Sequence, residues 1–362
     1  MPEHRRHKTH WALNALLCVG SPAAALLAIE LILRCAGYGR LEIYQPDPKL
    51  FWRLSPNQDC LTKVDRKPVH INSRGTRGPE FAEEKPPGTI RVLSLGDSRT
   101  FGWGLSDGET YSALLQEALQ ARFGNEARVE VINAGVNAWS FAQMKVFLQE
   151  HGLRYRPDVA VLEGANLWTQ FSEHASPEFA RAFMRRVRLK NLLRRSALYH
   201  WLIEVRLRSF YERHRTKFIP VVPEQDGLFK EQQRADPDAR FREEIAAFCQ
   251  IAISNGIRPV LLFLPTLDEL GGAEAPRTLR IKGDVARALG VPVVDARDAL
   301  RPLAPPPYLE ADPVHLDARG NRAIVAPLAD AVFPLLVPGH GGPRPGPQQP
   351  PGRTAPPATP NP

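Results

Sequence analysis

The sequence predicts an α/β protein in which a transmembrane helix precedes a three-layer α/β/α domain with a central parallel sheet. Two observations carry this prediction. From Thr89 onwards, short apolar runs alternate with helical patterns, and alternating β and α elements form parallel sheets covered by helices on both faces. Near the N-terminus, a predominantly apolar stretch is long enough to cross a bilayer.

The N-terminal stretch has the charge pattern of a membrane anchor. Arg5, Arg6 and Lys8 precede an apolar run over residues 11–33, which as a helix would span roughly 35 Å against a hydrocarbon core of about 30 Å. The positive flank predicts that residues 1–10 stay cytoplasmic and that the body is exported. We therefore expect a single-pass inner-membrane protein with a periplasmic or otherwise extracytoplasmic domain. A cleaved signal peptide and a buried soluble helix are the alternatives.

Two further segments flank the domain. Residues 34–88 are rich in turn formers and lack a helical period; we interpret them as an extension that packs on the domain, with a short strand and turn over 69–75. Residues 338–362 are dominated by Pro and Gly and are predicted to be disordered. Of the four cysteines, Cys60 and Cys249 are the pair that could form a disulfide in the body, and the sequence does not decide whether they meet.

The domain is predicted over residues 89–337, with strands and helices in regular alternation. The candidate strands are 90–95, 129–133, 158–163, 258–264 and 291–295. The candidate helices are 109–123, 139–153, 238–255, 276–289 and 317–335. Ser98, Gly135 and Asn166 each follow one of these strands by two or three residues. Because ligands bind at the carboxyl ends of the strands in such sheets, we expect these residues to converge.

A candidate nucleophile lies directly after the first of these strands. Ser98 closes the tripeptide Gly-Asp-Ser, and far downstream Asp312 and His315 are three residues apart. A hydroxyl, a base that takes its proton and a carboxylate that orients the base are the parts of an activated nucleophile. The short Asp-x-x-His spacing allows the carboxylate to reach one ring nitrogen while the other faces the serine. Asp97 is expected to fix the turn by hydrogen bonding.

Four separated blocks resemble the SGNH, or GDSL-type, esterase and lipase superfamily. They are Leu95-Gly96-Asp97-Ser98, Asn133-Ala134-Gly135, Gly164-Ala165-Asn166-Leu167 and Asp312-Pro313-Val314-His315. The resemblance covers roughly residues 89–336 and implies a flavodoxin-like domain. It also implies that Ser98 is the nucleophile, that Asp312 and His315 are its acid and base, and that the Ser98 N–H, the Gly135 N–H and the Asn166 side chain form the oxyanion hole.

The chain departs from the family pattern beside two of these residues. Leu167 stands where the family favours an aspartate after the asparagine, which bears on how that loop is held. Arg99 follows the serine where a small or aromatic residue is more usual, and it could mark a substrate preference.

The function predicted from these residues is ester hydrolysis by a serine triad through an acyl-enzyme. The substrate would be an O-acyl or O-acetyl ester of a carbohydrate or lipid. No cofactor is expected, because the sequence shows no metal-ligand spacing, phosphate loop or dinucleotide fingerprint. An O-acyltransferase that moves an acetyl group onto an extracellular glycan would use the same triad. A binding module that keeps the fold without turnover is the alternative outside enzymes.

The positive charge of the chain is local. Of a formal net charge of +8, residues 173–217 hold twelve Lys and Arg against four acids and so account for the whole excess. We interpret residues 173–237 as a lid-like insertion of one or two helices whose apolar face covers the domain. Docking on an anionic membrane surface and binding of an anionic glycan are the alternatives, and nucleic acid is disfavoured for an exported domain. The other histidines, His200 among them, are expected at the surface.

Overall fold

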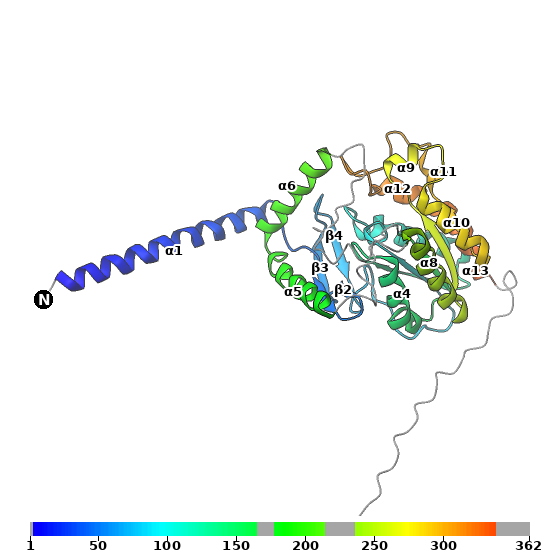
Figure 1. The fold of residues 1–362 in the computed structure, drawn as a ribbon, viewed down its shortest axis with the longest axis horizontal. Coiled ribbons are helices and arrows are strands. Elements are labelled where there is room, and N and C mark those ends of the chain that lie inside the picture. Colours follow the sequence, from blue (N-terminus) through cyan, green and yellow to red (C-terminus); the bar gives the residue numbers. More distant parts are fainter. Residues whose placement is uncertain (1–2, 165–176, 214–235, 338–362) are drawn as a thin grey trace, which may run out of the picture.

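The computed structural model describes residues 3–164, 177–213 and 236–337 and has a five-stranded parallel sheet at its centre (Figure 1). The strand order is β6-β5-β7-β8-β9, which is the 2-1-3-4-5 order of flavodoxin-like domains. Each of the five predicted strands is present, so the predicted fold class is confirmed. The strands are β5 Thr89–Gly96, β6 Arg128–Gly135, β7 Val159–Leu162, β8 Arg258–Phe263 and β9 Val293–Asp295.

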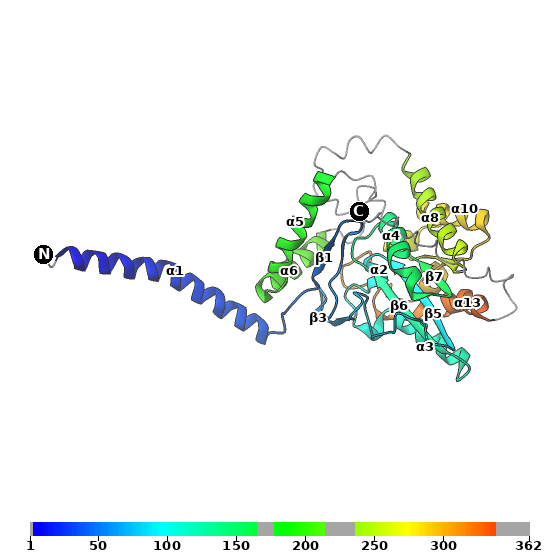
Figure 2. The ribbon, with the colours of Figure 1, turned by 90° about the horizontal axis from the view of Figure 1, so that it is seen from below.

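Helices cover both faces of the sheet (Figures 1 and 2). On one face lie α4 (Phe141–Glu150), α8 (Pro237–Ser254) and α10 (Arg277–Leu289), and on the other lie α3 (Tyr111–Phe123) and α13 (Val325–Leu336). These match the predicted helices, the last of which begins as a separate short helix. The shorter elements are α2 Ser98–Phe101, η1 Asp107–Glu109, η2 Gly152–Tyr155, α9 Leu267–Gly271, α11 Arg297–Leu300 and α12 Ala318–Ala323.

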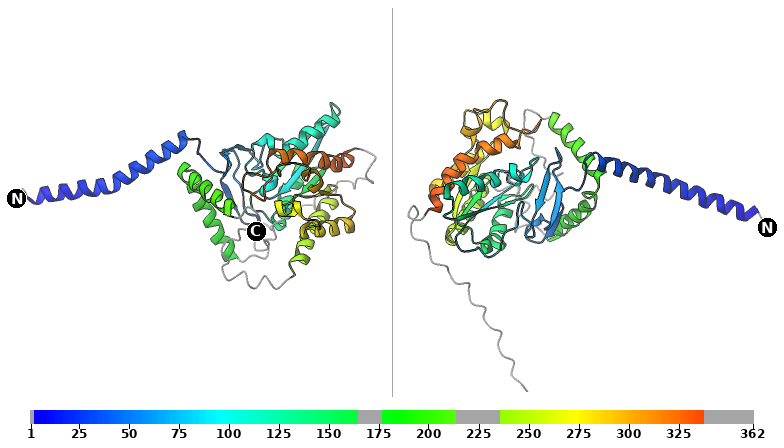
Figure 3. Two further views of the ribbon diagram at one scale, coloured as in Figure 1. Left: turned by 90° about the horizontal axis from the view of Figure 1, so that it is seen from above. Right: turned by 180° about the vertical axis from the view of Figure 1, so that it is seen from behind.

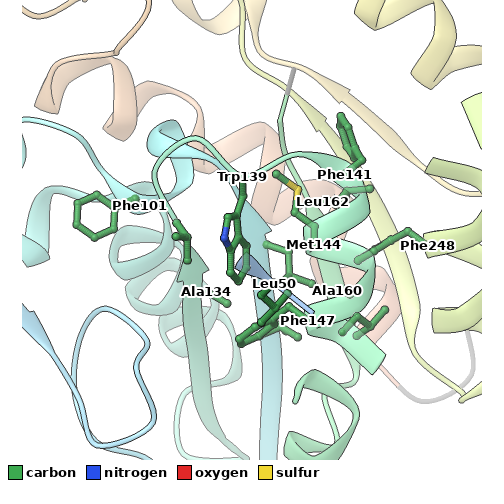
Figure 4. Close-up of a cluster of buried hydrophobic side chains, with 14 of the residues drawn as sticks. Leu50, Phe101, Ala134, Trp139, Phe141, Met144, Phe147, Ala160, Leu162 and Phe248 are labelled. Carbon is green, nitrogen blue, oxygen red and sulfur yellow. The ribbon is translucent and has the colours of Figure 1, made fainter. Parts of the chain in front are cut away.

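Alternation along the strands divides the core into two layers. On β5, Leu93 and Leu95 face the α4 and α8 side, whereas Val92 faces the α3 and α13 side, and all are fully buried. Figure 4 shows the first layer, where Trp139 and Phe147 pack beside the strands. Truncation of one such large side chain to alanine costs about 2–5 kcal/mol. The nearly continuous apolar strands reflect this burial on both faces.

The extension before the domain forms two antiparallel hairpins that belong to the folded body. The first pairs β1 (Tyr44–Asp47) with β2 (Phe51–Leu54), and the second pairs β3 (Gln58–Leu61) with β4 (Pro68–Ile71). The predicted strand and turn from Val69 are confirmed by β4 and the turn after it. Arg77 then bridges to Asn133 of the edge strand β6, with its N–H 3.0 Å from the Asn133 carbonyl oxygen. The second hairpin thereby continues the main sheet.

The N-terminal helix α1 (Glu3–Cys35) projects away from the body (Figure 1). Its segment Leu17–Cys35 is long and apolar enough to cross a membrane by length and composition, with a mean hydropathy of 1.7 and none of it buried. Among the residues described here, no other helix meets that criterion. A helix segment that is predominantly apolar and exposed along its length fits a lipid environment.

Helices α5 (Pro177–Leu193) and α6 (Ala197–Arg213) lie in the basic insertion and cover the extension (Figure 3). His200 of α6 is fully buried, and its Nδ1 is 3.2 Å from the Gly39 amide. The expectation of a surface position for His200 was therefore wrong, because α6 turns that face toward the extension.

Cys60 and Cys249 are both buried with free thiols, so the disulfide that the sequence left open is not formed. Residues 338–362, predicted to be disordered, lie outside the described part.

Candidate active site

Ser98 is the first residue of α2, directly beyond the end of β5. Asp97 caps this helix: its Oδ1 accepts a hydrogen bond of 3.0 Å from the Arg99 N–H, as predicted for a residue that fixes the turn. Close packing favours glycine at position 96, since a Cβ atom there would lie 1.9 Å from Thr100 Oγ1. The Gly-Asp-Ser sequence thus builds a tight strand-to-helix turn that ends on the Ser98 hydroxyl.

The structure brings Ser98, His315 and Asp312 together in a hydrogen-bonded relay. Ser98 Oγ lies 2.8 Å from His315 Nε2, and His315 Nδ1 lies 2.7 Å from Asp312 Oδ2. The other carboxylate oxygen of Asp312 accepts hydrogen bonds from the Val314 and His315 amides at 2.9 and 3.2 Å. Asp312 and His315 are buried. Because both Asp312 oxygens are engaged, the carboxylate is held in the position that orients the imidazole.

The imidazole of His315 is also supported from its face by residues that sequence reasoning missed. The Trp103 ring stacks on it with 5.2 Å between centroids and 17° between planes. Lys63, from the extension, places its Nζ 4.4 Å from the Trp103 ring centroid, a cation–π contact. Burial lowers the pKa of Lys63 to about 8. No local pattern marks Trp103 or Lys63, because their roles arise only from tertiary contacts.

A buried carboxylate, Glu42, links the extension to this region. It pairs with Lys63 and with Arg194 in the turn after α5, the latter at 3.1 Å. Its Oε1 also accepts hydrogen bonds from Tyr44 Oη at 2.9 Å and from Asn137 Nδ2 at 3.1 Å. Burial alone would raise the pKa of Glu42, but the two cations and these hydrogen bonds lower it to about 2. Glu42 therefore stays ionised and joins the extension, the basic insertion and the loop after β6.

Arg99 points into the interior and is held by charge. Its Nη2 lies 3.2 Å from Asp97 Oδ2 and 2.8 Å from Glu163 Oε1, and its Nη1 donates to the Leu264 carbonyl at 2.8 Å. Arg99 is buried. These contacts correct the suggestion that Arg99 marks a substrate preference, because its guanidinium is used to brace the turn that carries Ser98.

A second buried cation holds the loop that follows β7. Lys282 of α10 is fully buried and donates from Nζ to the carbonyls of Gly164 at 2.9 Å and Leu262 at 2.6 Å. Burial lowers the pKa of Lys282, and burial raises the pKa of its neighbour Glu163. Gly164 has a φ of +139°, which an L-residue side chain disfavours. Lys282 and the conformation of this glycine fix the backbone at residue 164. Asn166 and Leu167 lie outside the described residues.

Two of the three predicted oxyanion donors, the Ser98 N–H and the Gly135 N–H, belong to described residues. No described group accepts a hydrogen bond from the Ser98 N–H, consistent with the free amides at a helix start. The Gly135 N–H donates to Asn133 Oδ1 at 3.0 Å, so its use toward an oxyanion requires that bond to open. A Cβ atom on Gly135 would lie 2.2 Å from the Phe101 nitrogen. Close packing against α2 is thus a second reason for glycine here.

The loop after Gly135 carries a donor that sequence reasoning did not single out. The Val136 N–H donates to the Gly96 carbonyl at 3.1 Å, which places this loop beside the turn of the nucleophile. Two residues on, Ala138 has a φ of +66°, an uncommon value for a residue other than glycine. Its amide has no described acceptor. An amide with strained backbone, in a loop bonded to the turn of the nucleophile, is a candidate oxyanion donor.

Comparison with known families agrees with this arrangement. The model of the GDSL-like lipase/acylhydrolase family matches residues 94–323, which is more than half of the 362-residue chain. The chain belongs to this family. The match contains Ser98 and reaches past His315, so both ends of the relay fall inside it. This GDSL-like acylhydrolase is accordingly a carboxylic ester hydrolase.

This GDSL-like acylhydrolase is similar to several solved structures. TesA is 16% identical, with 68% of this chain and 99% of that chain covered and a TM-score of 0.42. A lipase/acylhydrolase from Enterococcus faecalis is 17% identical, with coverage of 69% and 98% and a TM-score of 0.42. An acetylxylan esterase from Geobacillus stearothermophilus is 13% identical, with coverage of 67% and 94% and a TM-score of 0.42. No curated protein matches the chain.

Proposed function

We propose that this family member is a membrane-anchored serine esterase that cleaves O-acyl or O-acetyl esters of a carbohydrate or lipid. The observation that carries the proposal is the relay, in which Ser98 Oγ lies 2.8 Å from His315 Nε2 and Asp312 lies 2.7 Å from His315 Nδ1. These distances are within the reach that proton transfer from a nucleophile to its base requires.

The reaction follows from these positions. Ser98 Oγ attacks the ester carbonyl while His315 Nε2 takes its proton, and Asp312 stabilises the imidazolium that forms. Collapse of the tetrahedral intermediate breaks the ester bond, and the departing alcohol receives the proton from His315. Water then adds to the acyl-serine with His315 as its base, which releases the carboxylic acid and restores Ser98.

The negative charge that develops on the carbonyl oxygen needs donors. We assign this role to the Ser98 N–H and the Asn166 side chain, with the Gly135 amide as a third donor once its bond to Asn133 opens. The amide of Ala138 is the alternative third donor, on account of its position and its positive φ. Removal of one such donor typically lowers kcat by about 10²–10³.

The location of the enzyme is part of the proposal. The apolar segment Leu17–Cys35 would anchor the chain in the inner membrane, and the basic residues before it would keep the N-terminus cytoplasmic. A phosphatase reporter fused after Pro338 should then be active, and the protein should stay in the membrane fraction after a high-salt wash. An inactive fusion with protein in the cytosolic fraction would contradict this topology.

The activity is tested by incubating the full chain in detergent with a chromogenic acetyl ester, with and without an acetyl-accepting glycan. Release of free acetate in both conditions supports the esterase. Transfer of the acetyl group to the glycan would identify an O-acyltransferase instead. The matched control is Ser98→Ala, which removes the nucleophile and keeps the fold. Equal turnover by the wild type and Ser98→Ala would refute the proposal.

A further inference from the structure

The inner face of the hairpin formed by α5 and α6 packs against the folded body. Phe183 of α5 packs against Trp52 of the extension, with ring centroids 5.1 Å apart, and Val187 is buried on the same side. On α6, His200 and Glu204 are buried toward the extension. One face of each helix thus packs on the extension.

The opposite face of the hairpin is apolar and exposed. Six large side chains on it have relative exposures between 37% and 65%. They lie in the last turns of α5 and the first half of α6, on both sides of the connecting turn 194–196. Soluble proteins rarely leave so many large apolar side chains exposed around one turn, and such a patch marks an interaction surface. The six are Leu189, Leu192, Leu193, Trp201, Leu202 and Val205.

The membrane helix is fastened to the same turn. Glu30 of α1 accepts hydrogen bonds from Ser196 Oγ at 2.7 Å and from the Ala197 and Leu198 amides at 2.9 and 3.0 Å, so it caps the start of α6. Arg34 donates to the Arg195 carbonyl at 3.1 Å. Figures 1 and 3 show α5 and α6 diverging from the end of α1. The exposed apolar side chains are therefore on the part of the hairpin nearest the segment Leu17–Cys35.

The charge around the patch is positive. Exposed arginines and a lysine flank the apolar side chains along both helices, and α5 has a single acidic residue, Glu178, in its first turn. Basic helices with an apolar face lie in the interface of membranes that contain anionic lipids. The exposed cations are Arg181, Arg185, Arg186, Arg188, Lys190, Arg195, Arg206 and Arg213.

From these observations we infer that the α5–α6 turn rests in the headgroup layer of the anionic bilayer that α1 crosses, with its apolar side chains at the acyl boundary. The inference rests on the membrane anchoring proposed above. Such a contact would fix the orientation of the domain. A single membrane helix would leave the domain free to rotate about the helix axis, whereas a helix and a second contact hold the domain in one orientation relative to the bilayer. The ion pair between Arg194, in the α5–α6 turn, and the buried Glu42 links this turn to the extension, so the extension is held in the same orientation.

Spin labels on the full chain in lipid nanodiscs test the inference. The background carries Cys18→Ser and Cys35→Ser, since these cysteines are exposed while Cys60 and Cys249 are buried. A label at Leu202→Cys probes the patch. A label at Ile253→Cys, which has a similar exposure of 41% but lies on α8 away from α1, is the matched control. A label at Leu27→Cys reports the anchor.

The readout is the accessibility of each label to oxygen relative to a water-soluble nickel chelate. In nanodiscs of anionic phosphatidylglycerol, we expect the label at Leu202→Cys to shift toward the lipid-like value of Leu27→Cys, while Ile253→Cys stays water-like. In nanodiscs of neutral phosphatidylcholine, or in 1 M salt where the Debye length falls to about 3 Å, that shift should shrink.

Three outcomes would overturn the inference. A water-like label at Leu202→Cys beside a lipid-like Leu27→Cys would show that the anchor holds but the hairpin does not touch the bilayer. A water-like label at Leu27→Cys would show that α1 does not cross the bilayer. That result would overturn the inference, while the esterase assay would be unaffected. Dipolar broadening between Leu202→Cys labels on two chains, with no lipid exposure, would assign the patch to self-association.

Discussion

Replacement of Glu42 by glutamine should destabilise the whole body, although Glu42 lies outside the hydrolase domain. A pKa of about 2 in the folded chain, against an ordinary value of 4.5, corresponds to on the order of 3 kcal/mol at neutral pH, since one pKa unit is about 1.4 kcal/mol. Removal of one partner from a buried ion pair costs a similar amount, about 3–5 kcal/mol, because Lys63 and Arg194 would remain largely shielded from water without their anion.

The sign of the pH dependence follows from the lowered pKa. Stability from an ionised Glu42 is fully present above about pH 4.5 and is lost as the pH falls toward 2. Urea unfolding of the full chain in detergent, followed by circular dichroism, should show Glu42→Gln less stable by about 3 kcal/mol at pH 7. The difference from the wild type should shrink between pH 5 and pH 3.

The matched control is Glu83→Gln, which breaks a 2.7 Å pair between Arg74 and Glu83 that is partly exposed. Exposed pairs contribute about 0–1 kcal/mol, so this variant should unfold close to the wild type. The reasoning is refuted if Glu42→Gln is no less stable than Glu83→Gln at pH 7, or if its deficit stays constant down to pH 3.

Three more predictions concern the site. Ser98→Ala and His315→Ala should each abolish ester turnover, and the double variant should be little worse, because the members of a triad act as a unit; additive losses would place the two residues in separate sites. Asn166→Ala should lower kcat by roughly 10²–10³ with little change in KM, because its amide faces charge present only in the transition state; an unchanged kcat would remove Asn166 from the mechanism. Gly135→Ala should reduce both stability and turnover, since its Cβ would lie 2.2 Å from the Phe101 nitrogen, and thermal unfolding with wild-type stability would contradict that packing.

Much of the fold was predictable because its signals are local. Five apolar runs alternate with helical patterns, so the strands and their helices could be located without tertiary information. The pairing of Ser98 with Asp312 and His315 could also be predicted, because a hydroxyl, a carboxylate and a base in these positions resemble the blocks of the SGNH superfamily. The short Asp-x-x-His spacing provides half of the relay within a single turn of chain.

What the sequence did not indicate depends on contacts between distant segments. Glu42 and Arg194 are 152 residues apart, and nothing near either residue marks it as buried. The sequence around Lys282 predicts an ordinary exposed cation on an amphipathic helix. In the structure Lys282 is fully buried and donates to the Gly164 carbonyl. Burial of a charged residue can be predicted only when the partner that compensates its charge is known.

The most direct test of the central claim is covalent labelling of the nucleophile. The full chain in detergent is treated with a fluorophosphonate, which forms a stable adduct with a serine that a neighbouring base has activated, and the adduct is located by peptide mass spectrometry. The relay of 2.8 and 2.7 Å predicts one adduct on the peptide that contains Ser98, lost in Ser98→Ala and strongly slowed in His315→Ala. No adduct on Ser98 in a folded wild type, or equal labelling of His315→Ala, would contradict the account.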